Sequence, residues 1–187
     1  MNIKTIMIVD DEQLMRDVVV EMLKDRADKI IPAESGQEAL DLLAQPEQVD
    51  IVITDMRMPG ISGYQLLEKI KAKNPSIPVV IMTGYDEAFG PEKVIRTGAE
   101  EYITKPFKKD EINLMVNRAI WRAASKRENI LLKYITAANR ALAESDDPDR
   151  EKLLNVGKAF EESISTLLEN KMADDENQTQ PASVLAT

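Results

Sequence analysis

Residues 50–55 read Asp50-Ile51-Val52-Ile53-Thr54-Asp55, a short apolar run that ends in a carboxylate. An unbroken run of β-branched residues of this length is typical of a strand that is covered on both faces of a parallel sheet. Two more runs, Thr5 to Val9 and Ile77 to Met82, have the same character. The sequence therefore predicts a parallel sheet with helices on both sides.

Short apolar segments alternate with longer amphipathic segments on both sides of this run, from residue 1 to about residue 122. The predicted strands are Thr5–Val9, Lys29–Pro32, Asp50–Thr54, Ile77–Met82 and Glu101–Thr104. The predicted helices are Gln13–Lys24, Gln37–Ala44, Tyr64–Ala72 and Glu92–Arg96, and a fifth helix begins near Asp110. This alternation indicates βα units around one sheet, so we expect an α/β domain over residues 1–122.

A helical extension over residues 123–171 is expected after this domain. Apolar residues keep helical spacing from Asp110 to Leu142 without a glycine or proline. Cap residues and a proline at 145–148 then predict the start of a second helix. Steps of four and three residues in that helix connect Leu153, Gly157, Phe160, Ile164 and Leu167. Such a seam packs either against the preceding helix or against another chain, as in a homodimer. The polar residues 172–187 are predicted to form a disordered tail.

The composition excludes several kinds of chemistry. The chain has neither cysteine nor histidine, so it has no disulfide, no thiolate nucleophile and no imidazole metal ligand. Its formal net charge of −9 argues against DNA binding, which depends on clustered Lys and Arg. No apolar run approaches the roughly 20 residues needed to span a membrane. Acidic residues follow the first predicted strand directly, which does not fit a secretory signal, so we expect a cytoplasmic protein.

Polar residues with complementary chemistry follow the predicted strands at the edge where open α/β sheets bind ligands. The first strand is followed by Asp10 and Asp11, the third by Asp55, the fourth by Thr83 and the fifth by Lys105. Converging carboxylates repel one another unless a cation compensates their charge, and Mg²⁺ is a hard cation that prefers oxygen ligands. A carboxylate is also a nucleophile toward phosphorus. The pattern predicts Mg²⁺-dependent phosphoryl transfer.

The sequence resembles the receiver domain of bacterial response regulators over about residues 3 to 122. The resemblance is carried, in chain order, by Ile6-Met7-Ile8-Val9-Asp10-Asp11-Glu12, by Asp50-Ile51-Val52-Ile53-Thr54-Asp55-Met56-Arg57-Met58-Pro59-Gly60, by Val79-Val80-Ile81-Met82-Thr83-Gly84, and by Gly98-Ala99-Glu100-Glu101-Tyr102-Ile103-Thr104-Lys105-Pro106-Phe107. It implies a flavodoxin-like fold, which is a doubly wound five-stranded parallel sheet of strand order 2-1-3-4-5 flanked by five helices. The C-terminal α-helical extension lies outside the resemblance.

The resemblance also implies the roles of the residues at the sheet edge. Asp55 would accept a phosphoryl group from a phosphohistidine on a sensor histidine kinase or a histidine phosphotransfer protein. Mg²⁺ would be held by Asp10, Asp11 and Asp55, with the backbone carbonyl of Arg57 as a further ligand. Lys105 would contact the phosphoryl oxygens, and its peptide bond to Pro106 is expected to be cis.

Two more pairs of residues complete the implied machinery. Thr83 and Tyr102 would form the switch that couples phosphorylation to the protein surface. Arg57 and Tyr85 would flank the phosphoryl group and modulate its hydrolysis. Because both are large, we expect a phosphoryl lifetime longer than seconds.

Different functions fit this pattern. The first is a phosphorylation-controlled switch that acts through protein interaction or dimerisation by residues 123–171. The second is a phosphate sink or shuttle in which the extension is purely structural. The third is an independent phosphatase of the haloacid dehalogenase type, but such enzymes usually carry a second acid two residues after the nucleophile, where this chain has Arg57. We expect a chain that catalyses only its own phosphorylation and dephosphorylation.

Overall fold

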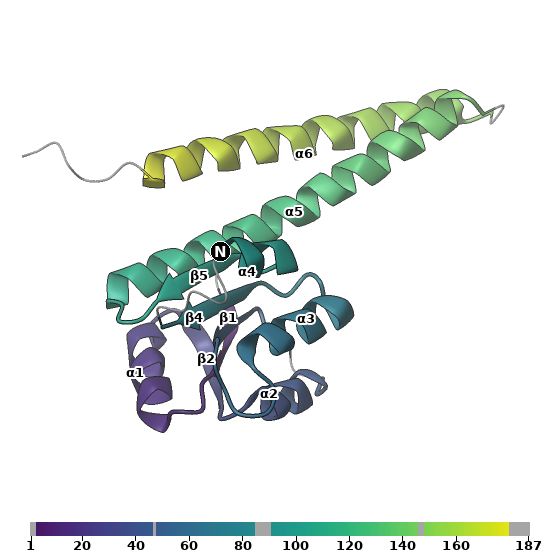
Figure 1. Ribbon diagram of the computed structural model, residues 1–187. Helices are drawn as coiled ribbons and strands as arrows, with labels where there is room; N and C mark the ends of the chain where they lie inside the picture. Colours follow the sequence, from purple (N-terminus) through teal and green to yellow (C-terminus); the bar gives the residue numbers. More distant parts are fainter. Residues whose placement is uncertain (1–2, 47, 85–90, 146–147, 180–187) are drawn as a thin grey trace, which may run out of the picture. The chain divides into compact units, whose positions relative to one another are not determined.

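Figure 1 shows the computed structural model of the chain, which describes residues 3–46, 48–84, 91–145 and 148–179. The chain divides into two compact units, Met1–Ala123 and Ala124–Thr187. The first unit holds a parallel sheet with helices around it, and the second is helical (Figure 1). None of the helices in the described ranges has the length and apolar character needed to cross a bilayer.

The sheet of the first unit has the order β2-β1-β3-β4-β5, and every neighbouring pair is parallel. The strands are β1 (Ile3–Val9), β2 (Ala27–Ala33), β3 (Ile51–Asp55), β4 (Val79–Thr83) and β5 (Glu101–Thr104). This confirms the predicted five-stranded flavodoxin-like sheet. The strand order reverses between β1 and β3, which is the place where open α/β sheets form their ligand crevice.

The helices are α1 (Gln13–Leu23), α2 (Gly36–Leu43), α3 (Gly63–Lys73), α4 (Pro91–Thr97), α5 (Lys109–Ala143) and α6 (Arg150–Thr179). Two of the helices, α2 and α3, begin after a serine whose side chain caps them. The Ser35 hydroxyl accepts a hydrogen bond from the Glu38 backbone N–H at 3.2 Å. Ser62 and Gln65 form a reciprocal capping box at the start of α3. This box sets the direction in which α3 leaves the loop that follows β3.

The core lies on both faces of the sheet, because successive strand residues point to opposite sides. Met7 and Val9 of β1 belong to the cluster that includes α3, through Leu66 and Leu67. The cluster on the other face contains the alternate strand residues together with side chains from α1 and α5, among them Ile6, Ile8, Ile51, Ile53, Val80, Met82, Val19, Leu23, Ile112 and Val116. Burial on both faces explains why β1, β3 and β4 are nearly continuous apolar runs.

Buried ion pairs fix β5, the short edge strand that leads to Lys105. The Glu101 carboxylate is 6% exposed and lies 2.8 Å from Arg122 Nη1 and 3.6 Å from Arg118 Nε, both on α5. Glu100 is 3% exposed and pairs at 2.8 Å with Lys71 of α3. These pairs hold β5 between α3 and α5 and thereby set the position at which Lys105 leaves the sheet.

The extension differs from the prediction at both ends of its second helix. Helix α6 begins at Arg150, after the turn at Pro148, and it continues to Thr179. The prediction of a disordered tail from residue 172 is therefore wrong over residues 172–179, and residues 180–187 lie outside the described ranges. The sequence has no glycine or proline between Lys158 and Gln180, so nothing breaks the helical backbone over this stretch.

Candidate functional site

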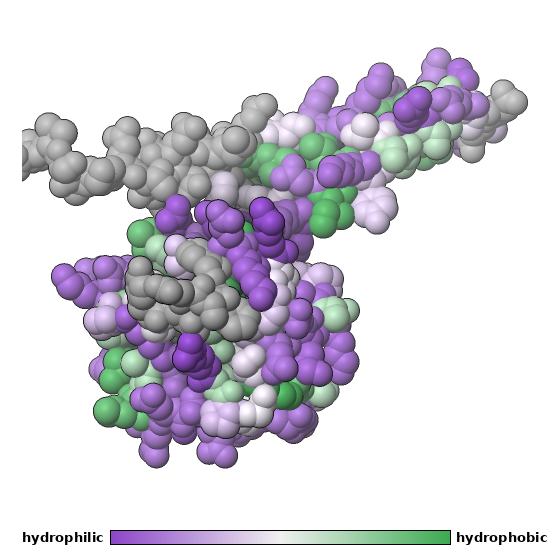
Figure 2. Space-filling view, in the orientation of Figure 1, coloured by the Kyte–Doolittle hydropathy of each residue, from purple (hydrophilic) through white to green (hydrophobic). Residues whose placement is uncertain are grey.

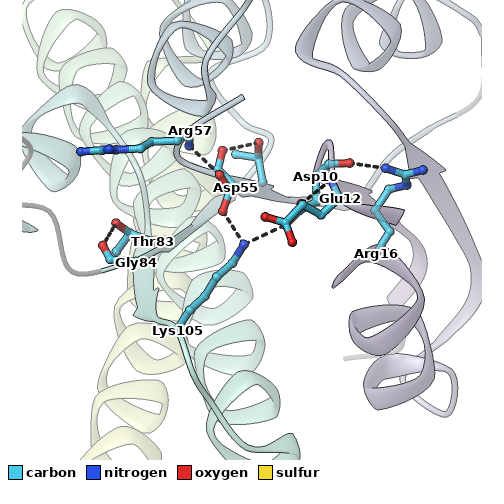
Figure 3. A network of polar contacts seen from close by, with 9 residues as sticks. Asp10, Glu12, Arg16, Asp55, Arg57, Thr83, Gly84 and Lys105 are labelled. Atoms are coloured by element: carbon cyan, nitrogen blue, oxygen red, sulfur yellow. Dashed lines mark hydrogen bonds and ion pairs between the residues drawn. The ribbon is translucent and has the colours of Figure 1, made fainter. Parts of the chain in front are cut away.

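Polar side chains from three strands meet at the carboxyl edge of the sheet (Figure 3). Asp10 directly follows β1, Asp55 is the last residue of β3, and Lys105 directly follows β5. Since β1 and β3 are neighbours at the reversal of strand order, their terminal carboxylates face one crevice. The structure thus brings together three of the residues that the sequence singled out.

Lys105 bridges the two carboxylates. Its Nζ lies 2.5 Å from Asp55 Oδ1 and 2.8 Å from Asp10 Oδ2. Asp10 is 1% exposed and Asp55 is 8% exposed, so both charges are largely removed from water. Burial lowers the pKa of Lys105, but its hydrogen bonds to Asp10 and Asp55 outweigh this effect and raise the pKa above its usual value of 10.5. Lys105 is therefore a permanent cation at neutral pH.

Backbone groups orient the remaining carboxylate oxygens. The Arg57 N–H donates to Asp55 Oδ2 at 2.6 Å, and the Glu12 N–H donates to Asp10 Oδ1 at 2.9 Å. Arg16 donates from Nη1 to the backbone carbonyl of Asp10 at 2.5 Å and so braces the loop after β1. The sequence analysis missed Arg16, because its only signal is a position one helical turn into α1.

The acidic residues fit a divalent cation by charge and by donor type. Asp10 and Asp55 together carry two negative charges against the single charge of Lys105, and carboxylate oxygens are the ligands that Mg²⁺ prefers. Asp11 is exposed, and within the described part of the chain no three acidic side chains are grouped closely enough to hold a metal by themselves. The expected convergence of three carboxylates is therefore found for Asp10 and Asp55 and not for Asp11, whose side chain is exposed, and one negative charge of the buried pair is left without compensation by Lys105.

Thr83 and Tyr102, the predicted switch residues, lie on β4 and β5. The Thr83 hydroxyl donates to the Gly84 carbonyl at 2.6 Å, and a Cβ added to Gly84 would meet nothing within 4 Å. Tyr102 is partly buried against the core cluster that contains α3 residues. The peptide bond between Lys105 and Pro106 is cis, as the resemblance implied. Tyr85 lies outside the described residues.

Gly63 is a further site residue that the sequence analysis missed. A Cβ on Gly63 would lie 1.9 Å from the backbone oxygen of Asp55 and 2.9 Å from its carbonyl carbon. The Gly63 N–H donates to the Met56 carbonyl at 3.1 Å. Only glycine allows the first turn of α3 to pass this close to the strand that carries Asp55. The signal in the sequence was the glycine next to the Ser62 cap.

We expect Gly63→Ala to lower the free energy of unfolding by about 3 kcal/mol, because the added methyl overlaps main-chain atoms that cannot rotate away. Gly84→Ala is the matched control, since its Cβ enters open space and should change stability by less than about 0.5 kcal/mol. Urea unfolding followed by circular dichroism measures both. Equal stability of the two variants would show that the close approach of Gly63 is not a constraint.

Comparisons with known proteins find relatives of the α/β unit. The model of the response regulator receiver domain matches residues 6–117. The DNA-binding transcriptional regulator NtrC of Klebsiella pneumoniae is 38% identical over 113 residues, which are 60% of this chain and 24% of that protein. A cyclic di-GMP phosphodiesterase of Thermotoga maritima is 35% identical over 116 residues, which are 62% of this chain and 31% of that protein. This chain thus spans less than a third of these curated relatives.

Solved structures of receiver domains are also similar to this chain. A response regulator receiver domain protein from Clostridium thermocellum has a TM-score of 0.59 and 30% identity, with 68% of this chain and 98% of that chain covered. A parallel α/β sheet that gathers buried carboxylates around a lysine at its switch point defines a flavodoxin-like protein with an acidic site at the carboxyl edge of the sheet. The chain belongs to the response regulator receiver domain family, whose model covers more than half of it. Receiver domains act in two-component phosphorelay signalling and generally use Mg²⁺ for phosphorylation.

Proposed function

We propose that this chain is a phosphorylation-controlled switch in which Asp55 accepts a phosphoryl group from a phosphohistidine on a sensor histidine kinase or a histidine phosphotransfer protein. The observation that carries this proposal is the Lys105 ammonium, which lies within hydrogen-bond distance of both Asp55 and Asp10. A fixed cation beside a nucleophilic carboxylate balances the charge that three incoming phosphoryl oxygens bring.

Transfer replaces one bond to phosphorus by another. An Asp55 carboxylate oxygen forms a bond to phosphorus, the bond from phosphorus to the donor imidazole nitrogen breaks, and the imidazole leaves with the electron pair and takes up a proton. The Arg57 N–H holds Oδ2 of Asp55, so the carboxylate is oriented before the donor arrives. Mg²⁺, held by Asp10, Asp11, Asp55 and the Arg57 carbonyl, would neutralise phosphoryl oxygens beside Lys105.

Phosphorylation would change the conformation through the hydrogen bond of the Thr83 hydroxyl. The Thr83 hydroxyl, which now donates to Gly84, can donate instead to a phosphoryl oxygen on Asp55. Movement of Thr83 at the end of β4 would shift the position of Tyr102, since Ile81 of β4 is paired with Tyr102 of β5. Arg57, whose side chain is exposed next to the acceptor, would modulate access of water to the acyl phosphate.

The proposal limits catalysis to the chain's own phosphorylation and dephosphorylation. The relatives named as a phosphodiesterase and as a DNA-binding regulator are three to four times as long as the matched part. Their named activities are therefore not carried over to this chain. A sink or shuttle of phosphate uses the same site, but the family comparison does not favour it over signalling.

Magnesium dependence tests the proposal. We expect incorporation of phosphate from phosphoramidate or acetyl phosphate in millimolar Mg²⁺, and at least about 100-fold slower incorporation in EDTA at matched ionic strength. The measurement is the intact mass of the chain, which rises by one phosphoryl group. Equal incorporation with and without Mg²⁺ would refute the role of the acidic pocket.

A further inference from the structure

The second compact unit is a helical hairpin formed by residues 124–143 of α5 and by α6. Its two helices are antiparallel (Figure 1), and side-chain contacts between them define one line of contact. Asn139 Nδ2 donates to Glu161 Oε2 at 3.0 Å, and the Thr136 hydroxyl donates to Glu161 Oε1. A Cβ on Gly157 would lie 1.8 Å from Asn139 Oδ1, so α6 approaches α5 closely there.

The less exposed residues of the hairpin follow this line of contact. They recur at helical spacing on α5 as Leu132, Ile135, Asn139 and Leu142, and on α6 as Leu154, Gly157, Glu161, Ile164 and Leu168. The predicted seam of α6 is therefore split. Gly157 and Ile164 lie on the contact line, whereas Leu153, Phe160 and Leu167 do not, with exposed fractions of 44%, 59% and 51%.

Exposed apolar side chains form a second surface on the hairpin, the outer apolar face. Its large members are Ile130, Leu131 and Tyr134 on α5 and Leu153, Val156, Phe160 and Leu167 on α6, each 44–72% exposed. At about 100° per residue most of them lie roughly a sixth to a third of a turn from the contact line and Ile130 nearly half a turn, all in the same rotational sense on both helices. Because the helices are antiparallel, both sets lie on the same side of the hairpin. Hydrophobic surface is visible over these helices in Figure 2.

On the outer apolar face, large side chains of one helix lie at the same level as small side chains of the other helix. The contacts of Asn139 and Thr136 with Glu161 set the level of each residue along the hairpin. At the level of Ile130, Leu131 and Tyr134, helix α6 exposes Ser163 and a single large side chain, Leu167. At the level of Leu153, Val156 and Phe160, the side of α5 that carries Tyr134 presents the small residues Ala137, Ala138 and Ala141, although Arg140 and Glu144 are also exposed at this level. Large side chains thus lie on α5 at one end and mainly on α6 at the other.

We propose that the outer apolar face binds the same face of a second copy of this chain and forms a four-helix bundle. A two-fold axis along the hairpin places α5 of one copy on α6 of the other at the same level, so that bulky side chains meet small ones. Two helices alone make a single layer, and a stable core needs a second layer to cover the exposed stripe. Seven large, half-exposed side chains offer an area comparable to the roughly 800 Å² per partner of a stable interface. The inference goes beyond the proposed function and does not depend on phosphorylation.

Sedimentation equilibrium of the full chain without phosphoryl donor tests the proposal. We expect a dimer of the 21.0 kDa chain at micromolar concentration. Phe160→Lys should weaken dimerisation at least about 30-fold, because it places a charge in the centre of the interface. Asn155→Lys is the matched control, since residue 155 is exposed and lies about 140° around α6 from Phe160, and the variant should dimerise like the wild type. A monomeric wild-type chain, or equal dimerisation of both variants, would overturn the proposal.

Introduced cysteines test the arrangement of the two copies, since the chain has no cysteine of its own. An oxidised mixture of Ala141→Cys chains and Val156→Cys chains should give a disulfide-linked heterodimer at least about 10-fold more abundant than either linked homodimer, because the axis sets α5 against α6. Preferential linkage within each variant would overturn this arrangement. Phosphorylation of Asp55 is not required in either experiment, so their failure would leave the proposed function untouched.

Discussion

Asp55→Asn should abolish incorporation of phosphate from small acyl-phosphate and phosphoramidate donors, with a loss of at least about 1,000-fold. The reason lies in the nucleophile, because an amide oxygen is far less nucleophilic than a carboxylate and cannot form the acyl phosphate. The amide is nearly isosteric, so it keeps an acceptor for the Arg57 N–H that now bonds Asp55 Oδ2 at 2.6 Å. The loss should therefore be specific to transfer and not caused by unfolding.

The matched control for this variant is Asp41→Asn. Asp41 is an exposed residue of α2 whose carboxylate accepts a hydrogen bond from the Gln37 side chain, one helical turn away, at 3.0 Å. Its replacement should leave the rate of incorporation unchanged within about 2-fold, because an exposed helix position far from the acidic pocket contributes little. Persistent labelling of Asp55→Asn, or equal loss in the two variants, would show that the acceptor lies elsewhere.

Lys105→Met should lower the free energy of unfolding by about 3 kcal/mol in the absence of divalent cations. Lys105 is the cation between two carboxylates whose side chains are 1% and 11% exposed, and removing one partner of a buried pair leaves uncompensated charge. Lys109→Met is the control, because both side chains of the Lys109–Asp25 pair are exposed. This pair should contribute less than about 0.5 kcal/mol to the free energy of unfolding. Urea unfolding in EDTA measures both variants.

Magnesium should restore part of the stability of Lys105→Met. A divalent cation that binds the folded chain between Asp10 and Asp55 stabilises it by mass action, and the variant lacks the ammonium that competes for the same carboxylates. We therefore expect millimolar Mg²⁺ to raise the unfolding midpoint of the variant more than that of the wild type. An equal effect of Mg²⁺ on both proteins would contradict the charge balance proposed for this pocket.

The sheet could be predicted from the sequence because each strand is marked by a short local run of apolar residues. The range Glu101–Thr104 was predicted at its observed bounds, and the other strands shifted by one or two residues at their ends, where burial changes gradually. The carboxyl edge was predictable for a related reason. Residues that end parallel strands share one edge, so Asp10, Asp55 and Lys105 could be brought together without knowledge of side-chain contacts.

Contacts that depend on tertiary approach were not predictable. Gly63 matters because its Cα passes the Asp55 carbonyl, and nothing in the local pattern around Gly63 reports that distance. Arg16 matters because its guanidinium reaches the Asp10 carbonyl from the first turns of α1. The division of the predicted α6 seam between two sides of the helix was not predictable for the same reason, since the close approach of Gly157 to Asn139 decides which of its residues face α5.

The central claim is that Asp55 carries the phosphoryl group in an acyl linkage. Borohydride reduction of the phosphorylated chain converts an aspartyl phosphate to homoserine, and peptide mass spectrometry then locates the change. We predict conversion at Asp55 in the peptide that contains β3, with Asp10 and Asp11 unmodified. Homoserine at another acidic residue, or phosphate that survives hydroxylamine, would contradict the account.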